Sequence, residues 1–358
     1  MSLSPPFPPG HPSRHSTPPL IRVLTDDRAG NNAQVLGVAE ALTWPMEETR
    51  LGYDRLVRLP NWLRGRSTLG LTAAAAAALD GGAVPDVAIA AGRRATPALR
   101  RLKQRHPQMV ALQIMWPGAP TGGLDLIAVP AHDRAAGGSA PGAHPADPRV
   151  IVTLGAPNRV TPAKLQAAAA DWARRFAAAG AGAGAGPRIG LLVGGSTKRA
   201  PFIPEDARQL GGMVAELARR TGGSVVATNS RRTGDAVTAA LGASLAPCRY
   251  WLHDVAKGGD NPYFGILGLA DLIVVTGDSM SMASEAASTG RPVAIFAPGG
   301  GTSKEARLHR ALYAHGAARP LNADFMAAGE TMWRYTPLQD AAVVATAVRR
   351  LVARSAPR

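Results

Sequence analysis

The sequence lacks the features of secreted and membrane proteins. It has one cysteine, Cys248, in 358 residues, so no disulfide can form within the chain and a reducing compartment is expected. No strongly apolar stretch reaches the roughly 18 residues of a membrane-spanning helix. The Pro- and Ser-rich residues 1–19 lack the apolar segment of a signal peptide and are expected to form a disordered tail. We therefore expect a cytoplasmic protein.

The motifs of several enzyme classes are missing as well. The eight histidines form no HxxH or HExxH pair, so no zinc site is predicted. The chain has no GxSxG turn of a serine hydrolase and no GxxxxGK[ST] phosphate loop, and no GxGxxG turn follows the first expected strand. We therefore predict neither a metal nor a cofactor, and neither a serine hydrolase nor a dinucleotide-dependent dehydrogenase.

The formal charge is +15, yet the basic residues are spread along the chain. Most of the charge comes from dispersed arginine pairs, with no continuous basic run and no aromatic stacking platform beside them. Nucleic-acid binding is therefore not expected. Residues 93–105 concentrate basic side chains in one expected helix, which would suit an anionic substrate or peripheral contact between the N-terminal domain and the inner membrane.

Short apolar strands alternate with helices from residue 20 onward. The strands are expected at residues 20–25, 85–92, 109–115, 124–130, 150–155, 188–195, 224–230, 250–254, 271–279 and 291–298. Such alternation predicts parallel sheets covered by helices on both faces. The fold class is therefore α/β, with two Rossmann-like domains.

A Gly/Ala run at residues 177–187 separates the two domains, because alternating glycine resists a fixed backbone. The predicted division is a tail (1–19), an N-terminal domain (20–178), a linker (179–187), a C-terminal domain (188–335) and a C-terminal helix that packs back on the N-terminal domain (336–358).

Ligands of open α/β sheets bind outside the carboxyl ends of the strands, so the loops that follow strands are the candidate sites. The loop after the strand at 188–195 contains Gly194, Gly195, Ser196, Thr197 and Lys198. Glycine amides, hydroxyls and a lysine suit a phosphate, although an ordinary tight turn has the same residues. The next such loop contributes Ser230 and Arg231, either as diphosphate ligands or as solvated side chains.

The loop and helix at residues 276–285 are the strongest candidate. An apolar strand runs into Asp278 and Ser279, and the N-terminus of the following helix would receive a diphosphate. Helical spacing places Asp278, Ser281 and Glu285 on one face, where Glu285 would accept hydrogen bonds from ribose hydroxyls. The alternative is an N-cap at Ser279 and a surface glutamate. Asn261, before another expected helix, would contact the base or sugar, or form a turn.

The N-terminal domain offers Asp26, Asp27 and Asn31 after its first strand. Two carboxylates and an amide beside a glycine would hold an acceptor hydroxyl and remove its proton. The alternative is that one of the aspartates caps the following helix.

The segments TDDRAGNNAQVLGVAEAL, PDVAIAAGRRATPALRRLK, LLVGGSTK, TNSRRT and NPYFGILGLADLIVVTGDSMSMASEA resemble, in this order, the family named for mitochondrial fission (elongated mitochondria). Its bacterial members are described as predicted glycosyltransferases or nucleoside-diphosphate-sugar epimerases. The resemblance covers about residues 20–320 and implies a GT-B-like arrangement with the donor held by the second domain. By position, it implies diphosphate and ribose contacts from Gly194, Gly195, Ser196, Ser279, Ser281 and Glu285. Relatives often have a histidine where this chain has Asn31, so Asp26 or Asp27 would have to replace it as a base.

Three hypotheses follow. The first is a glycosyltransferase that uses a nucleotide-diphosphate sugar as co-substrate and an acceptor that is either free or lipid-linked. The second is a non-catalytic scaffold with this fold that recruits partners or membranes. The third is a nucleotide-sugar epimerase, which would turn over its donor without an acceptor.

Overall fold

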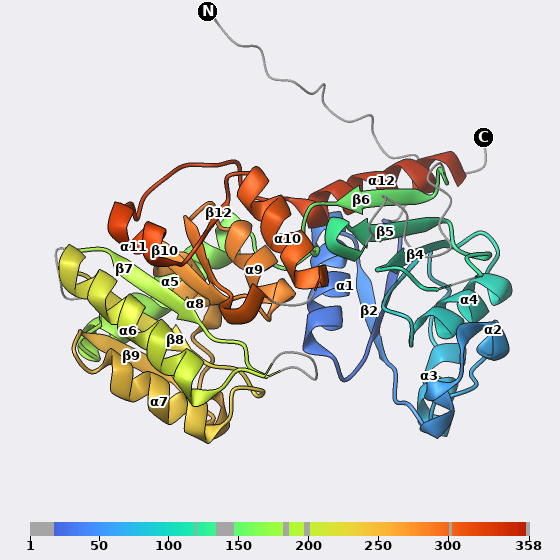
Figure 1. Cartoon of the computed structure of the whole chain (residues 1–358). Helices are drawn as coiled ribbons and strands as arrows, with labels where there is room; N and C mark the ends of the chain where they lie inside the picture. Colours follow the sequence, from blue (N-terminus) through green and yellow to red (C-terminus); the bar gives the residue numbers. More distant parts are fainter. Residues whose placement is uncertain are drawn as a thin grey trace, which may run out of the picture.

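Two parallel sheets lie side by side in the computed structural model (Figure 1). The structure describes residues 18–118, 120–133, 147–181, 186–196, 201–300 and 303–355. Each sheet has six strands, in the orders β2-β1-β3-β4-β5-β6 and β12-β11-β10-β7-β8-β9. All strand pairs within them are parallel. This confirms the predicted α/β class with two Rossmann-like sheets.

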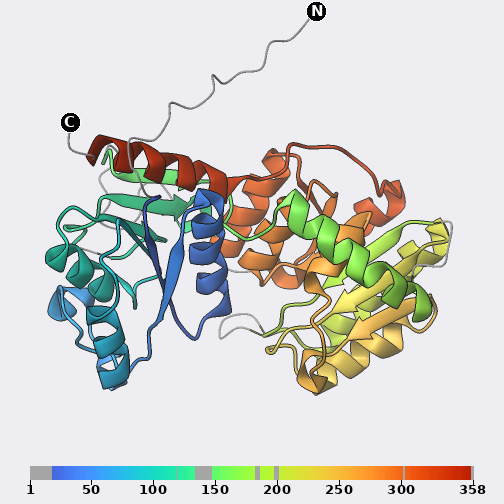
Figure 2. The same cartoon turned by 180° about the vertical axis from the view of Figure 1, so that it is seen from behind.

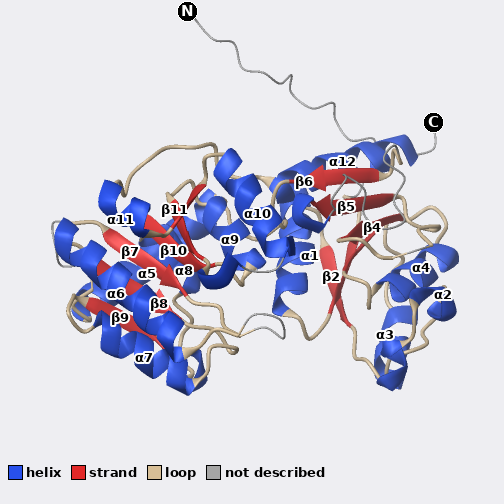
Figure 3. Cartoon of the chain, viewed as in Figure 1, coloured by secondary structure: helices blue, strands red, loops and turns tan. Residues whose placement is uncertain are grey.

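The first sheet is built from short apolar segments that helices cover on both faces (Figure 3). Its strands are β1 (Ile21–Thr25), β2 (Met46–Arg50), β3 (Val87–Ala91), β4 (Val110–Ile114), β5 (Leu126–Pro130) and β6 (Val150–Thr153). Its helices are α1 (Ala29–Leu42), α2 (Asn61–Arg64), α3 (Ala73–Asp80) and α4 (Thr96–Arg105), with 3-10 turns η1 (Arg55–Arg58) and η2 (Ala131–Asp133). β2 escapes prediction because its sequence, MEETR, is polar and mostly exposed at the sheet edge.

The second sheet follows the same alternation. Its strands are β7 (Arg188–Leu192), β8 (Ser224–Thr228), β9 (Tyr250–His253), β10 (Leu272–Thr276), β11 (Val293–Phe296) and β12 (Ala318–Pro320). The helices from here to the C-terminus are α6 (Pro204–Thr221), α7 (Asp235–Leu245), α8 (Tyr263–Leu269), α9 (Met280–Ala287), α10 (Ser303–Ala314), α11 (Ala323–Ala328) and α12 (Asp340–Ser355), with 3-10 turns η3 (Val255–Lys257) and η4 (Pro298–Gly300). The three-residue β12 was not predicted, because so short a strand has no readable period.

Two helices pack on the half that does not precede them in the sequence, as the view from behind shows (Figure 2). The helix α5 (Pro162–Ala178) follows the first sheet in sequence but packs on α8, with Trp172 and Phe176 in the apolar core of the second half. From the sequence this segment is expected in the first half. The last helix, α12, returns to pack on α1, with Val344 and Val348 in the core of the first half. The chain therefore passes between the halves twice.

Candidate functional site

The Gly194–Gly195 turn follows β7 at the carboxyl end of the second sheet. The Gly194 N–H donates to Oγ1 of Thr276 (2.7 Å), and the Gly195 N–H donates to Oδ2 of Asp278 (3.0 Å). A methyl group at Gly194 would overlap the Asp278 carboxylate, so the glycine allows the two loops to touch. The loops after β7 and β10 therefore meet, but an aspartate occupies one of the amides expected to face a phosphate.

Of the other residues in the predicted phosphate loop, the structure describes Ser196 alone. The hydroxyl of Ser196 bonds to the backbone of Phe202, accepting from its N–H at 3.0 Å and donating to its carbonyl at 3.2 Å. Ser196 thus closes its own turn. Thr197 and Lys198 lie outside the described residues.

The loop after β8 completes this cluster. Ser230 donates its hydroxyl to the Gly194 carbonyl (2.6 Å). Arg232 pairs with Asp278 at 2.9 Å, whereas Arg231, the arginine predicted from the sequence, forms no salt bridge within the described residues; both arginines are exposed. Neighbouring side chains in a turn point in different directions, and the sequence alone does not tell which of the two reaches Asp278. The arginine at this site is therefore Arg232, and Asp278 already neutralises it.

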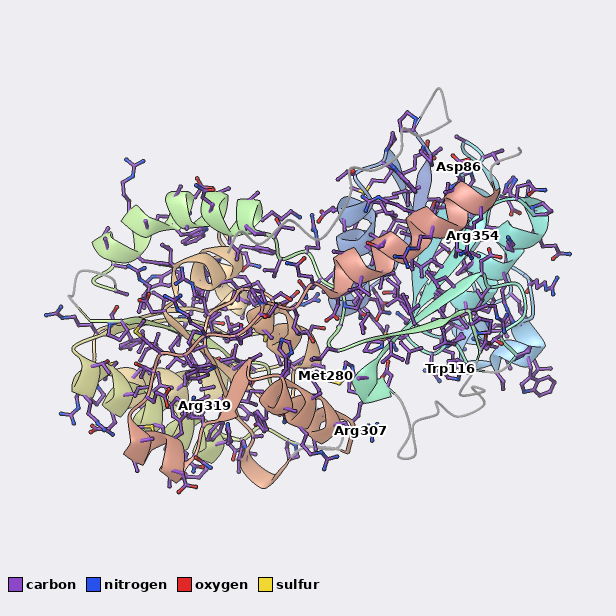
Figure 4. All side chains as sticks on the ribbon, turned by 90° about the horizontal axis from the view of Figure 1, so that it is seen from above. Asp86, Trp116, Met280, Arg307, Arg319 and Arg354 are labelled. Atoms are coloured by element: carbon purple, nitrogen blue, oxygen red, sulfur yellow. The ribbon has the colours of Figure 1, made fainter. Side chains whose placement is uncertain are left out.

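The N-terminus of α9 faces the N-terminus of α1. Ser279 caps α9 by accepting from the Met282 N–H (3.4 Å). A methyl group at Gly30, in the first turn of α1, would lie 3.0 Å from Oγ of Ser281. Figure 4 shows Met280, the first residue of α9, between the two halves. Each helix N-terminus carries a partial positive charge, so an anion placed where the two meet would be stabilised by both.

Glu285 lies further along α9 and accepts a hydrogen bond from the hydroxyl of Tyr263. Burial raises the pKa of Glu285 to about 7, although the Tyr263 hydrogen bond opposes that rise. Asn261 is exposed and accepts from the Tyr263 N–H (3.0 Å), so it shapes the turn that begins α8. The sequence pointed to Tyr263 only as a neighbour of Asn261 that would contact a base or sugar, and its hydrogen bond to Glu285 was not predicted.

Asp278, Ser281 and Glu285 were expected on one face, but they contact three different elements. Asp278 bonds to the loops after β7 and β8, Ser281 lies against α1, and Glu285 bonds to α8. Asp278 precedes the helix, which begins at Met280, so helical spacing does not apply to it.

On the N-terminal side, Asp26 and Asp27 share one cation. The Arg94 guanidinium donates to Oδ2 of Asp26 (2.9 Å) and also pairs with Asp27. Asp26 is buried and accepts from the Arg28 N–H (2.8 Å), and Asn31 lies at the limit of hydrogen-bond distance from it (3.4 Å). Asp27 is exposed, and its hydrogen bond with Arg94 lowers its pKa. Asp26 thus orders the turn before α1, but it does not cap the helix, because the N-cap residue is Arg28 and no side chain among the described residues accepts from the first turn.

Arg94 was missed because the arginine pair at 93–94 was attributed to a basic helix surface. It comes from a loop 68 residues away from Asp26 in sequence. That loop follows β3, which is paired with β1 in the sheet. The rule that carboxyl ends of neighbouring parallel strands share one edge would have placed Arg94 beside Asp26.

Several buried polar atoms around Arg94 have no hydrogen-bond partner in the described part of the chain. They are Oη of Tyr53, Oδ1 of Asn61, Nη1 of Arg64, Nε of Arg94 and Nε1 of Trp116. The Arg94 guanidinium lies over the Tyr53 ring, 4.5 Å from its centroid, and Arg64 donates to the Arg94 carbonyl (3.1 Å). Buried polar atoms are usually satisfied, so this region has hydrogen-bonding capacity for a ligand or for water.

Behind the helix N-termini, the two halves are joined through the loop from β6 to α5. Asn158 donates to the Ser288 hydroxyl (2.9 Å), and its backbone lies so close to Gly37 of α1 that a methyl group there would overlap it. A cavity of about 420 Å³ lies at this junction, lined by residues including Glu40, Arg159 and Asp340. None of the predicted site residues lines it.

Two searches of the described residues bear on other site types. No three His, Cys, Asp or Glu side chains gather there in a way that would hold a metal ion. No helix in this part of the chain is long and apolar enough to cross a membrane.

Comparisons with solved structures identify the fold. UDP-GlcNAc 2-epimerase from Methanocaldococcus jannaschii superposes with a TM-score of 0.55 at 13% identity, covering 93% of this chain and 99% of that one. The Neisseria meningitidis UDP-GlcNAc 2-epimerase, solved bound to UDP-GlcNAc, superposes with a TM-score of 0.51 at 13% identity, covering 92% and 100%. At this identity the likeness concerns the fold, which is GT-B.

Comparisons of sequence identify the family. An uncharacterized protein of Rickettsia prowazekii, RP120, is 27% identical over 92% of this chain and 97% of its own length. The mitochondrial fission protein ELM1 of Arabidopsis thaliana is 29% identical over 75% of this chain, which spans 64% of the Arabidopsis protein. The family model described as Mitochondrial fission ELM1 matches residues 29–352. The chain therefore belongs to the mitochondrial fission ELM1 family.

Proposed function

We propose that this protein binds a nucleotide-diphosphate sugar where the carboxyl ends of its two sheets meet, and transfers the sugar to an acceptor. The observation that carries the proposal is the meeting of two helix N-termini, with Gly30 of α1 against Ser281 of α9. Two such ends repel each other unless an anion lies near them. The GT-B fold, shared with the solved epimerases, is consistent with this ligand class.

The diphosphate would lie at Ser279 and Ser281 rather than on the Gly194–Gly195 turn. The reason is electrostatic, since the Asp278 carboxylate already takes the Gly195 N–H and the charge of Arg232. Ribose hydroxyls would bond to Glu285, which lies further along the same helix. As the bond between sugar and diphosphate breaks, the helix ends would stabilise the charge that develops on the leaving diphosphate.

The acceptor would lie on the N-terminal side. Its hydroxyl oxygen would form the new bond to the sugar, and its proton would pass to Asp26 or Asp27. Because Arg94 lowers the pKa of Asp27, that carboxylate carries no proton at neutral pH. The unpartnered Tyr53 hydroxyl and Trp116 Nε1 nearby are available to orient the acceptor.

The donor site is tested with UDP, GDP, ADP and CMP as probes in thermal unfolding and calorimetry. A ligand that binds only the native state at 100 times its Kd adds about 2.7 kcal/mol of stability, so at least one probe is expected to raise Tm clearly. The double variant Ser279→Ala/Ser281→Ala is expected to weaken that binding at least tenfold, since hydrogen bonds to charged groups contribute about 1.5–3 kcal/mol.

The matched control is Ser244→Ala, which removes a hydroxyl that bonds within α7, away from the helix N-termini. This variant should bind the probe like the unaltered protein. If millimolar amounts of all four probes leave Tm and the calorimetric signal unchanged, the proposal is wrong.

A second candidate is epimerisation of the bound nucleotide sugar, which Glu285 favours. With a pKa of about 7, this carboxyl group is able both to accept and to return a proton at neutral pH. The two reactions are distinguished by incubating UDP-GlcNAc with the protein and no acceptor, because only an epimerase then produces a mixture of sugar isomers.

We also propose that the protein acts in the cytoplasm, at the inner face of the membrane.

A further inference from the structure

Exposed apolar side chains gather in the segment from residue 55 to 69, called here the η1–α2 segment. Of the ten large apolar side chains exposed in the described residues, this segment has four: Leu56, Leu63, Leu69 and Trp62, which is 66% exposed. Single exposed apolar residues are ordinary, but several together mark an interaction surface. In Figure 1, α2 lies at the outer end of the first half, away from the second sheet.

The η1–α2 segment is also purely basic. Arg55, Arg58 and Arg66 are exposed, and no acidic residue occurs between 55 and 69. None of these three arginines forms a salt bridge within the described residues. Their charge is therefore available to an anionic partner.

The helix predicted from the sequence to contact a membrane, α4, has no such unpaired basic side chains within the described residues. On α4, Arg101 and Arg105 both pair with Asp80, and Lys103 pairs with Asp125. Arg100 is buried and donates to the Gly122 and Pro120 carbonyls. The basic residues of α4 are thus paired or buried, so this helix offers little free charge to a membrane.

The fold holds the apolar side chains outward. Asn61 is buried and donates to the carbonyls of Arg93 and Pro117, at 3.0 Å each. Arg64 is also buried and donates to the Leu69 carbonyl at 3.0 Å. Because Asn61 and Arg64 anchor the two ends of α2 inward, the residues between them, Trp62 and Leu63, face solvent.

We propose that the η1–α2 segment docks the protein onto an anionic lipid surface. Trp62, Leu56 and Leu63 would enter the interfacial region, where tryptophan is favoured, and the three arginines would lie at the level of the lipid phosphates. Charge complementarity decides for this partner, because exposed apolar side chains that alternate with unpaired arginines, with no acid between residues 55 and 69, match an anionic bilayer.

Docking here would place the proposed acceptor site near the lipid surface. Arg94 bonds to Asp26 and Asp27, and its own carbonyl accepts from Arg64 of α2. A single residue thus connects the docking segment with the predicted catalytic carboxylates. The docking itself does not depend on the proposed function, because neither a nucleotide nor a sugar takes part in it.

The test is vesicle co-sedimentation of the full chain without nucleotide. The vesicles contain phosphatidylcholine alone or with one third phosphatidylglycerol. We expect binding to the anionic vesicles only. The variant Trp62→Ser/Leu63→Ser should weaken it at least tenfold, and Arg55→Gln/Arg58→Gln/Arg66→Gln should weaken it about a hundredfold, at about fivefold per arginine. Brominated lipid should quench the fluorescence of the unaltered protein more strongly than that of Trp62→Phe.

The matched control is Met332→Ser/Val343→Ser, which removes two exposed apolar side chains elsewhere and should bind like the unaltered protein. All these positions are exposed, so each variant should unfold at the same temperature as the parent. The proposal is overturned if the unaltered protein does not sediment with anionic vesicles. It is equally overturned if Trp62→Ser/Leu63→Ser binds like the control, whether or not the arginine variant is weakened, because the apolar side chains would then take no part in binding.

Discussion

Asp27 in the first half and Glu285 in the second lie near the carboxyl ends of parallel strands, yet their pKa values shift in opposite directions. The hydrogen bond from Arg94 lowers the pKa of the exposed Asp27. Burial raises the pKa of Glu285 to about 7, and Tyr263 offsets only part of the rise. The comparison teaches that Arg94 favours the ionised form of Asp27 in the first half, whereas the second half holds a carboxyl group that changes protonation near neutral pH. Groups so separated commonly have different roles in a reaction.

The largest effect is expected from Glu285→Gln. A folded-state pKa of about 7, raised from 4.5, means that the unaltered protein loses stability as pH rises through that interval, by about 3 kcal/mol in total. Glutamine does not titrate, so the variant should be the more stable protein at pH 8 by about that amount, and the gap should close towards pH 4.5. Urea unfolding at several pH values measures it. A gap that does not change with pH would contradict the raised pKa.

A smaller loss is expected from Asp26→Asn. The variant keeps the shape of a buried side chain but removes the charge that Arg94 faces, so we expect a loss of about 2 kcal/mol. Asp27→Asn is the matched control, because Asp27 meets the same guanidinium but its side chain is 69% exposed. Its loss should stay below about 1 kcal/mol. Asp27 contributes stability above its unfolded-state pKa, and this part disappears as pH falls through its lowered folded-state pKa. Equal losses in the two variants, measured by urea unfolding at pH 7, would show that burial does not distinguish the two aspartates.

The smallest effect is expected from Tyr263→Phe, which removes the hydroxyl that donates to Glu285. Since that hydrogen bond lowers the pKa of Glu285, the variant should raise it further and reduce stability at pH 8 by about 1 kcal/mol. The double variant with Glu285→Gln tests the coupling. If the loss is the same with and without the glutamate, then Tyr263 acts through packing alone.

The alternation of apolar strands and helices was readable along the sequence because each strand of a parallel sheet is buried on both faces. β10, LIVVT, is an example. β2 was not readable because an edge strand with polar side chains lacks that signal. The packing of α5 on the second sheet was also not readable, since Trp172 and Phe176 indicate burial but not the partner.

For the candidate site too, the sequence predicted some features and not others. Residue type and position after a strand identified Gly194, Asp26 and Glu285 as candidates. The same information did not show that Asp278 would meet the Gly195 amide or that Arg232, rather than Arg231, would pair with Asp278. Such pairings depend on the directions in which loops leave neighbouring strands, and those directions are set by packing.

The sequence by itself determined the family, the α/β class and the loops in which chemistry is expected, because these depend on local pattern and residue type. Only the tertiary structure decided that the N-termini of α1 and α9 meet, that Arg94 serves both aspartates, and that the free charge lies on the η1–α2 segment rather than on α4. The physical reason is that charge and polarity act over a few ångströms in space. Residues far apart in the chain come within that distance only when the apolar cores bring their strands together.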